Sequence, residues 1–390
     1  MVVNSNLTSQ LVEALEGVLG NLPRQLHEPS FTGNEWKYLK DCLDSNSVSS
    51  IGSYVDQFEN NIAELTGANY AVAVVNGTAA LHISLKLAGV MQNDEVIIPA
   101  LTFVATANAV TYCGAQPHFV DIEEKNLGID TNKLHNYLLA TTVQKFGQCV
   151  NKSSGRVIRA IVPMHTFGHP SNIDGLLDIC KKFNLFLIED AAEALGSYYK
   201  GKHVGTFGLF GTLSFNGNKT ITTGGGGVIL TNNSELAKQA KHLTTTAKIP
   251  HKWKYQHDQI GFNYRMPNIN AAIGCAQLEQ LESKLQSKRL LFKLYKSAFD
   301  HIPGIKLFKE PESCKSNYWL QTIILDENQM SALEEILEVT NNLQIKTRPV
   351  WDILSDLNPF KNYPKMDLEN ARSLSRRIIN IPSSPNIINS

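Results

Sequence analysis

The chain has 390 residues, and its 36 lysines and arginines balance 36 aspartates and glutamates, so the formal net charge is +0 at pH 7. Such a balance provides no field that attracts nucleic acid or an anionic membrane surface, which excludes proteins that bind these partners through bulk charge. The length is sufficient for one large domain and a smaller one, and the apolar runs are too short to span a membrane.

The first residues predict a helix rather than a targeting signal. Residues 1–20 contain neither a basic leader nor a continuous apolar stretch, so we expect no export signal and a cytoplasmic protein. Apolar side chains recur there at the spacing of an amphipathic helix (Leu7, Leu11, Val12, Leu15, Val18 and Leu19). The six cysteines are scattered without a C-x-x-C pair, which predicts reduced thiols and no metal site.

Helix and strand patterns alternate through the next part of the chain. The helical patterns cover residues 54–65, 78–88, 103–112 and 173–183, and the strand patterns cover 71–75, 95–99, 117–121, 157–163 and 185–189. This alternation predicts an α/β fold with a mostly parallel sheet and helices on both faces. Because ligands of such sheets bind beyond the carboxyl ends of the strands, Asn76, Thr102 and Asp190 are expected at one site.

The pattern changes after Met266. A helical period continues to about Phe299 and predicts one long helix, after which short strands (319–325 and 344–348) mix with helices (331–340 and 368–377). We therefore expect three parts. They are an N-terminal helical arm (1–30), a large domain (31–265), and a bridging helix with a small C-terminal α+β domain (266–390).

Lys219 is the main candidate for catalysis. It follows Ser214 by five residues and precedes four consecutive glycines, Gly224 to Gly227. The serine hydroxyl can bind a phosphate, and the glycines permit close backbone approach. A lysine amine in such a setting can lose its proton and form a Schiff base with pyridoxal 5'-phosphate (PLP). An isolated lysine beside glycines is otherwise a solvated surface residue.

Two carboxylates near a predicted strand end have alternative roles. Asp190 follows the apolar run 185–189, where it can keep the pyridine nitrogen of PLP protonated or cap a helix that begins at Ala191. Glu193 can be the capping-box partner of such a helix or a contact to the ring hydroxyl of the cofactor.

Two further segments complete a predicted cofactor site. Asn76, Gly77, Thr78 and Ala79 follow a strand and open a helix, so their backbone N–H groups and the helix dipole can bind the phosphate. Phe103 follows another strand and is either a core residue or the aromatic wall that stacks on the pyridine ring.

Five segments together resemble the sugar-nucleotide aminotransferases of the DegT/DnrJ/EryC1/StrS family, which have the fold type I architecture of aspartate aminotransferase. The segments are residues 76–81, 99–106, 189–193, 214–227 and 261–266. The resemblance covers nearly the whole chain and implies that Lys219 binds PLP, that Asp190 pairs with the ring nitrogen, and that Thr78, Ala79 and Ser214 bind the phosphate. It also implies that Asn263 reaches the phosphate of a neighbouring subunit in a homodimer with shared active sites. The family includes dehydratases with histidine in place of the lysine, so Lys219 favours transamination.

Residues 21–29, 48–52, 244–248 and 347–351 are similar to the LegC-type branch of this family. That similarity implies amination at C4 of a UDP-linked 4-keto-6-deoxy-N-acetylhexosamine, with glutamate as donor, for a bacterial surface glycan of the legionaminic acid or bacillosamine type. An aminotransferase acting on a dTDP- or GDP-linked 3- or 4-keto sugar is the alternative, and a non-catalytic regulatory paralogue is a third.

Five side chains are candidates for substrate contact. Arg348 and Trp351 lie in a segment that can fold over the site, where the guanidinium would hold a diphosphate and the indole would cover a sugar or base. An ordinary surface turn is the other interpretation of that segment. Lys248, His251 and Trp253 form a second candidate group.

Overall fold

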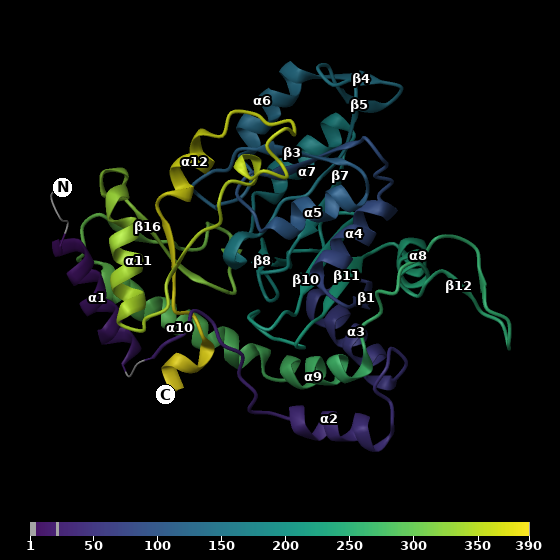
Figure 1. The fold of residues 1–390 in the computed structure, drawn as a ribbon, viewed down its shortest axis with the longest axis horizontal. Coiled ribbons are helices and arrows are strands. Elements are labelled where there is room, and N and C mark those ends of the chain that lie inside the picture. Colours follow the sequence, from purple (N-terminus) through teal and green to yellow (C-terminus); the bar gives the residue numbers. More distant parts are fainter. Residues whose placement is uncertain (1–4, 21–22, 390) are drawn as a thin grey trace.

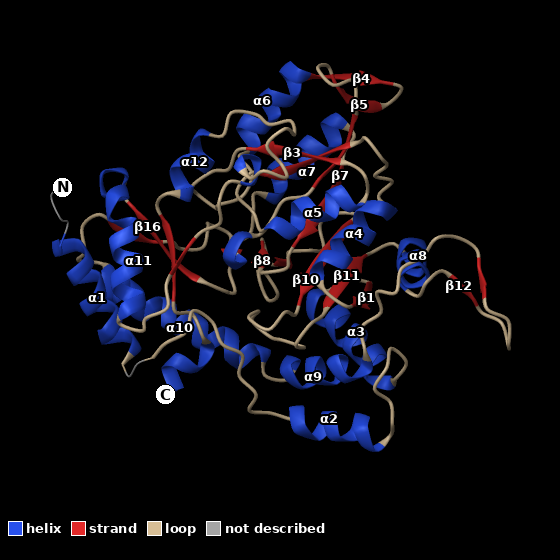
Figure 2. Ribbon diagram, viewed as in Figure 1, coloured by secondary structure: helices blue, strands red, loops and turns tan. Residues whose placement is uncertain are grey.

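The computed structural model describes residues 5–20 and 23–389. A nine-stranded sheet forms the main body of these residues, and a four-stranded sheet with its own helices lies beside it (Figures 1 and 2). The α/β prediction is confirmed. None of the helices in the described ranges combines the length and the apolar character that crossing a membrane requires.

The strand order of the main sheet is β1-β11-β10-β7-β6-β2-β3. The strands between β10 and β3 run parallel, whereas β11 runs antiparallel to both of its neighbours. All five predicted strands are present. The bounds are β1 Tyr70–Val74, β2 Glu95–Pro99, β3 Gln116–Val120, β6 Val157–Ile161, β7 Phe186–Asp190, β10 Phe210–Ser214 and β11 Gly227–Thr231, with the hairpin β4 Thr142–Lys145 and β5 Gln148–Asn151 added beside β6.

Helices cover both faces of this sheet because its strands carry apolar side chains on both faces. Val72 and Val74 of β1 pack toward α4 and α5, while Ala73 packs with Phe58 of α3 on the opposite face. The four predicted helices are confirmed to within about a residue at each end. The helices of this body are α2 Glu35–Asp44, α3 Ser53–Thr66, α4 Gly77–Leu87, α5 Val104–Tyr112, α6 Thr131–Thr141, α7 Ile173–Phe183 and α8 Ser234–Thr244.

The predicted single long helix is wrong, because the chain forms two helices, α9 Asn268–Leu278 and α10 Leu281–Phe299. The break at Glu279 and Gln280 lies between two helices that pack in different hydrophobic clusters. Cys275 of α9 packs in the cluster of Phe58, whereas α10 contributes Tyr295 to the cluster beneath the smaller sheet. Neither glycine nor proline marks the break, so helical periodicity alone does not reveal it.

The smaller sheet pairs antiparallel in the order β14-β16-β18-β17. Its elements are β14 Ile305–Leu307, β16 Gln321–Leu325, β17 Arg348–Pro349 and β18 Ile378–Ile381, with α11 Leu333–Asn342 and α12 Glu369–Ser375. The predicted strand 344–348 is wrong over its first residues. Gln344 has a φ of 61°, and the residues after it bond to Arg24 of the N-terminal segment.

The N-terminal helix α1 Ser5–Leu19 packs on this smaller unit. Leu7, Leu11, Leu15 and Leu19 are buried in one cluster with residues of α10, α11, β16 and β18. The predicted amphipathic helix is therefore confirmed over its described residues. Residues 1–4, as well as Asn21 and Leu22 of the 21–29 motif, lie outside the described residues.

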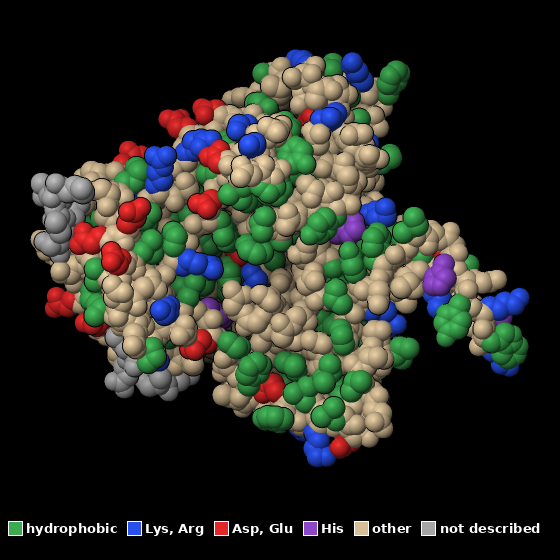
Figure 3. Space-filling model, in the orientation of Figure 1, with side chains coloured by type: hydrophobic (Ala, Val, Ile, Leu, Met, Phe, Trp, Pro, Cys, Tyr) green, Lys and Arg blue, Asp and Glu red, His purple; other side chains and the backbone are tan. Residues whose placement is uncertain are grey.

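Two small sheets complete the fold. One joins β8 Tyr198–Tyr199, β9 Lys202–His203 and β15 Cys314–Lys315. The other is the hairpin of β12 Lys248–Ile249 and β13 Gln256–His257, which projects away from the body (Figure 1). Hydrophobic, basic and histidine side chains gather along this projection (Figure 3).

Candidate active site

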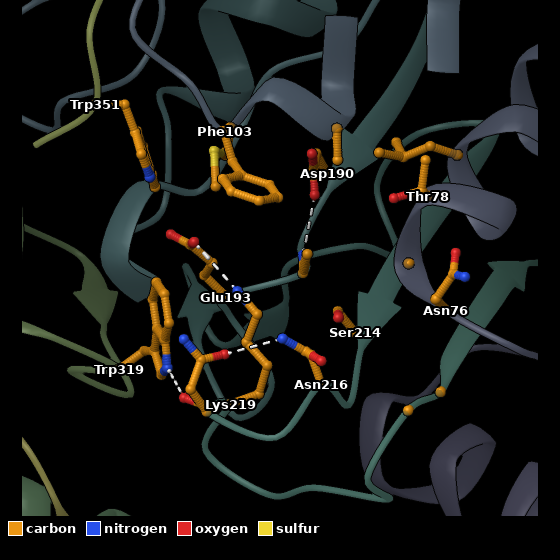
Figure 4. Close-up of a pocket in the computed structure, with 18 of the residues that line it drawn as sticks. Asn76, Thr78, Phe103, Asp190, Glu193, Ser214, Asn216, Lys219, Trp319 and Trp351 are labelled. Carbon is orange, nitrogen blue, oxygen red and sulfur yellow. Dashed lines mark hydrogen bonds and ion pairs between the residues drawn. The ribbon is translucent and has the colours of Figure 1, made fainter. Parts of the chain in front are cut away.

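A cavity of about 350 Å³ opens at the carboxyl ends of β1, β7 and β10 (Figure 4). Sequence-predicted residues form much of its lining: Asn76, Gly77, Thr78, Phe103, Asp190, Glu193, Ser214, Lys219, Arg348 and Trp351. Met164, Asn216, Asn218 and Trp319 also line it and were not predicted. The edge of a largely parallel sheet is thus the point where the predicted segments meet.

The N-terminus of α4 and the hydroxyl of Ser214 form one end of the cavity. A Cβ added to Gly77 would lie 3.0 Å from the Cβ of Ser214, so glycine permits this close approach. The N–H groups of Gly77 and Thr78 have no acceptor within the helix because they belong to its first turn. Asn76 caps the helix by accepting the N–H of Ala79 at 2.8 Å.

Asp190 ends strand β7 with its carboxylate buried in the cavity wall. Thr106 Oγ1 donates to its Oδ2 at 2.8 Å, and the backbone N–H of Ala192 donates to its Oδ1 at 3.2 Å. Burial raises the pKa of this carboxyl, and the hydrogen bond from Thr106 opposes that rise. The described segment 191–197 forms turns, so the helix-cap alternative for Asp190 is wrong.

The adjacent Glu189 points to the other face of the sheet and has a structural role. Its carboxylate accepts the N–H groups of Gly205, Phe207 and Gly208 at 2.7–2.9 Å. Burial opposes its ionisation, but these bonds and the contact with His165 hold the pKa of Glu189 below its usual value. Strand alternation therefore assigns one carboxylate to the fold and the next to the cavity.

Glu193 and Lys219 form an ion pair in the middle of the cavity. Lys219 Nζ lies 3.2 Å from Glu193 Oε1, and the backbone N–H of Phe167 donates to Oε2 at 2.9 Å. Phe167 has a φ of 55°, an unfavourable conformation that aims this N–H group at the carboxylate. Burial raises the pKa of Glu193, and the charge of Lys219 opposes the rise. The capping-box alternative for Glu193 is wrong because no helix forms in the described segment that follows Asp190.

Three aromatic side chains surround the mouth of the cavity. Trp319, which is 2% exposed, places its ring centroid 3.8 Å from Lys219 Nζ. Phe103 and Trp351 lie across from it, with ring centroids 6.2 Å apart (Figure 4). Arg348 lines both this cavity and a shallower hollow outside it, so the segment 348–351 borders the mouth.

The other predicted site residues do not reach this cavity. Lys248, His251 and Trp253 belong to the projecting β12–β13 hairpin, where the Nζ of Lys248 lies 4.0 Å from the ring centroid of Tyr255. Asn263 is exposed beside Thr245 and is not part of the lining. Within one chain, these four residues are thus separated from the cavity.

The residues of the cavity fit PLP. The α4 N-terminus and Ser214 offer donors to a phosphate, Lys219 offers an amine to an aldehyde, and Asp190 offers a carboxylate to a protonated ring nitrogen. Among the described residues, Lys219 pairs with Glu193 rather than with the buried Asp190 carboxylate, so a cationic ring nitrogen would satisfy Asp190.

Comparison with known proteins places this site in a family. The model of the DegT/DnrJ/EryC1/StrS aminotransferase family matches residues 29–390. The GDP-perosamine synthase of Escherichia coli O157:H7 is 39% identical over 368 residues, which cover 93% of this chain and 94% of that protein. The putative pyridoxal phosphate-dependent aminotransferase EpsN of Bacillus subtilis is 36% identical, with 93% and 91% covered.

A solved structure shows the same architecture. The DegT DnrJ EryC1 StrS aminotransferase from Brucella abortus superposes with a TM-score of 0.80 at 26% identity, covering 90% of each chain. These similarities extend over the cavity and both sheets. The chain therefore belongs to the DegT/DnrJ/EryC1/StrS aminotransferase family and is a PLP-dependent sugar-nucleotide aminotransferase.

Proposed function

We propose that the protein transfers the amino group of glutamate to C4 of a nucleotide-linked 4-keto-6-deoxy sugar, with Lys219 as the catalytic residue. The observation that supports this proposal best is the placement of Lys219, Asp190 and Ser214 around one cavity. These groups match the aldehyde, ring nitrogen and phosphate of the cofactor. A surface-glycan pathway in the cytoplasm is the proposed setting, in keeping with six cysteines that are all free.

Each residue has a distinct task in this proposal. Bound PLP supplies an electron sink that stabilises negative charge at the carbon beside the transferred nitrogen. Lys219 would remove a proton from that carbon of the donor and pass it to the cofactor, and in the second half of the cycle it would take a proton back and deliver it to C4 of the sugar. One amine would thus serve as both base and acid. Asp190 keeps the ring nitrogen protonated, and the N–H groups of Gly77 and Thr78 hold the phosphate with the Ser214 hydroxyl. Glu193 is proposed to contact the ring hydroxyl, and Phe103 to stack on the ring.

The nucleotide of the substrate is proposed to be GDP. The Escherichia coli relative is named for the synthesis of GDP-perosamine, a GDP-linked amino sugar, and its similarity covers nearly the whole chain. The UDP-linked N-acetylhexosamine implied by the LegC-like motifs is the competing substrate. Arg348 would bind the diphosphate in either case, since it borders the mouth and forms no ion pair with another described residue.

We also propose a homodimer in which each site uses residues of both subunits. Asn263, Lys248, His251 and Trp253 lie too far from their own cavity to serve it, and the hairpin that carries three of them projects from the body. Trp253 is 70% exposed, Tyr255 82% and Ile260 84%, so several large apolar side chains gather on the surface of this segment. A neighbouring copy would cover them, and the hairpin would contact its substrate.

A substrate panel tests the proposal. Purified protein with PLP and glutamate is incubated with 4-keto-6-deoxy sugars linked to GDP, UDP or dTDP, and the products are identified by mass spectrometry and NMR. We expect a 4-amino sugar from the GDP substrate and none from the Lys219→Ala variant. Faster amination of the UDP-linked N-acetyl sugar would overturn the choice of GDP. Full activity of Lys219→Ala would overturn the role of the lysine.

A further inference from the structure

The amine of Lys219 lies between a carboxylate and an indole face. Glu193 Oε1 is 3.2 Å from Nζ on one side, and the ring centroid of Trp319 is 3.8 Å from it on the other. Figure 4 shows these two side chains meeting at the lysine, on the side away from Asn76 and Thr78. A carboxylate and an aromatic face are the two surroundings that bind an ammonium group most strongly in a pocket.

Trp319 is held firmly in this position from the smaller sheet. Its indole Nε1–H donates to the backbone carbonyl of Asn218 at 2.7 Å, directly before Lys219. Its backbone N–H donates to Asn317 Oδ1 at 2.8 Å, and its carbonyl accepts a hydrogen bond from the buried Lys288 Nζ at 3.0 Å. The face of the ring, rather than its N–H group, is therefore what Trp319 offers to the lysine.

Asn317 fixes the same segment to the carboxylate side of the cavity. Its Nδ2 donates to the backbone carbonyls of Glu193 and Leu195 at 2.8 and 2.9 Å. The residues that flank the amine are thus tied to each other through buried bonds, although one follows a strand of the main sheet and the other precedes a strand of the smaller sheet. Such cross-linking fixes the distance between the carboxylate and the indole.

We propose that Trp319 is a positioning residue that, with Glu193, forms a holding site for the Lys219 amine. This inference rests on the proposed role of Lys219. Transamination releases the lysine from the cofactor in the first half of the cycle, and the lysine must rebind in the second. A long, flexible side chain loses rotamer freedom when it is fixed in one position. The holding site keeps the released amine next to the cofactor. The side chain of Lys219 is then already largely ordered when its bond to the cofactor forms again.

The test measures how fast the amine attaches to PLP. The full-length apoprotein is mixed with PLP, and the bond at Lys219 is followed by absorbance and verified by borohydride reduction and peptide mass spectrometry. Trp319→Leu and Trp319→Met remove the ring face, whereas Trp319→Phe keeps a face and removes the N–H group. Pyridoxamine phosphate is the control ligand, because it has no aldehyde and binds without the lysine.

We expect the rate constant for attachment to fall about tenfold in Trp319→Leu and Trp319→Met, which corresponds to the loss of a buried cation–π contact. In Trp319→Phe it should stay within about threefold of the wild-type value. The dissociation constant of pyridoxamine phosphate should stay within about twofold in all variants. An equal loss in Trp319→Phe would assign the effect to the bond with Asn218 and overturn the proposal. A parallel loss of pyridoxamine phosphate affinity would overturn it in favour of general pocket damage. Attachment of PLP to Lys219 in the wild-type protein tests the proposed role of the lysine itself, independently of how the Trp319 variants behave.

Discussion

Thr106 gives a sharp test of the proposed task of Asp190. It lies on α5, is 1% exposed, and donates its hydroxyl to Asp190 Oδ2 at 2.8 Å. Thr106→Val keeps the shape of the side chain and removes only this donor. For Asp190 to keep the ring nitrogen protonated, its carboxylate must be a weaker base than that nitrogen. The hydrogen bond from the Thr106 hydroxyl stabilises the ionised carboxylate and so lowers its basicity.

The size of the effect follows from the geometry. A hydrogen bond to a buried charged group contributes about 1.5–3 kcal/mol, so losing the bond from Thr106 should raise the pKa of Asp190 further. The shared proton then moves toward Asp190 and leaves the ring nitrogen with less positive charge. We expect kcat of the glutamate half-reaction to fall about 10- to 100-fold.

Two measurements check this prediction. Stopped-flow absorbance gives kcat of the half-reaction, and the ¹⁵N chemical shift of labelled PLP reports the charge on the ring nitrogen. Thr106→Ser restores a hydroxyl at the same position and should retain most of the activity. An unchanged nitrogen shift in Thr106→Val together with wild-type kcat would refute the reasoning.

Three further predictions concern Arg348 at the mouth of the cavity, Gly227 beside the N-terminus of α4, and the carboxylate of Asp190. Arg348→Ala should raise KM for the sugar nucleotide about 10- to 100-fold while KM for glutamate and kcat change little, and an unchanged sugar KM in steady-state assays would remove Arg348 from the diphosphate site. Gly227→Ala places a Cβ 2.4 Å from the Asn76 carbonyl, whereas a Cβ at Gly225 meets only Val75 O at 3.8 Å; urea unfolding should show a loss of about 3 kcal/mol for Gly227→Ala and little change for Gly225→Ala. Burial raises the pKa of Asp190 above its ordinary value of 3.8, so its ionisation destabilises the folded apoprotein as pH rises through the raised value and has no effect below 3.8. Asp190→Asn should therefore become more stable relative to wild type as pH rises in the absence of PLP, and a pH-independent difference would contradict this.

Local sequence patterns predicted most strands of the main sheet, but they did not predict which strands pair when these lie far apart in the sequence. The run 96–99 is apolar and short, and it is bounded by polar residues on its N-terminal side, which favours a strand buried on both faces. The pairing of Tyr70 with Thr231 joins segments far apart in the sequence, and nothing in either segment specifies it. The break between α9 and α10 is likewise set by tertiary partners, since Gln277 and Gln280 both donate to Glu35 Oε1, at 2.5 and 2.9 Å.

The same division applies to the site. Asp190 was predictable because it follows a recognisable strand at the binding edge of the sheet, and Ser214 because it lies five residues before Lys219 and the glycine run. Thr106 and Trp319 were not, because a threonine in a helix and a tryptophan beside a strand are ordinary core residues in sequence. Their roles arise from single tertiary contacts to Asp190 and Lys219. The resemblance to the family implied the roles of Lys219 and Asp190, whereas the side chains that hold them in place were found only in the structure.

The packing of α1 has a consequence for synthesis on the ribosome. Its buried leucines contact α10 and β18, which begin only at Leu281 and Ile378, so the first helix leaves the ribosome long before its partners exist. At a synthesis rate of about 5–20 residues per second, that apolar face stays uncovered for tens of seconds. During this interval the main sheet can form without it. Until β18 has been synthesised, the leucine-rich first segment of the nascent chain therefore lacks the partners that bury it in the complete fold.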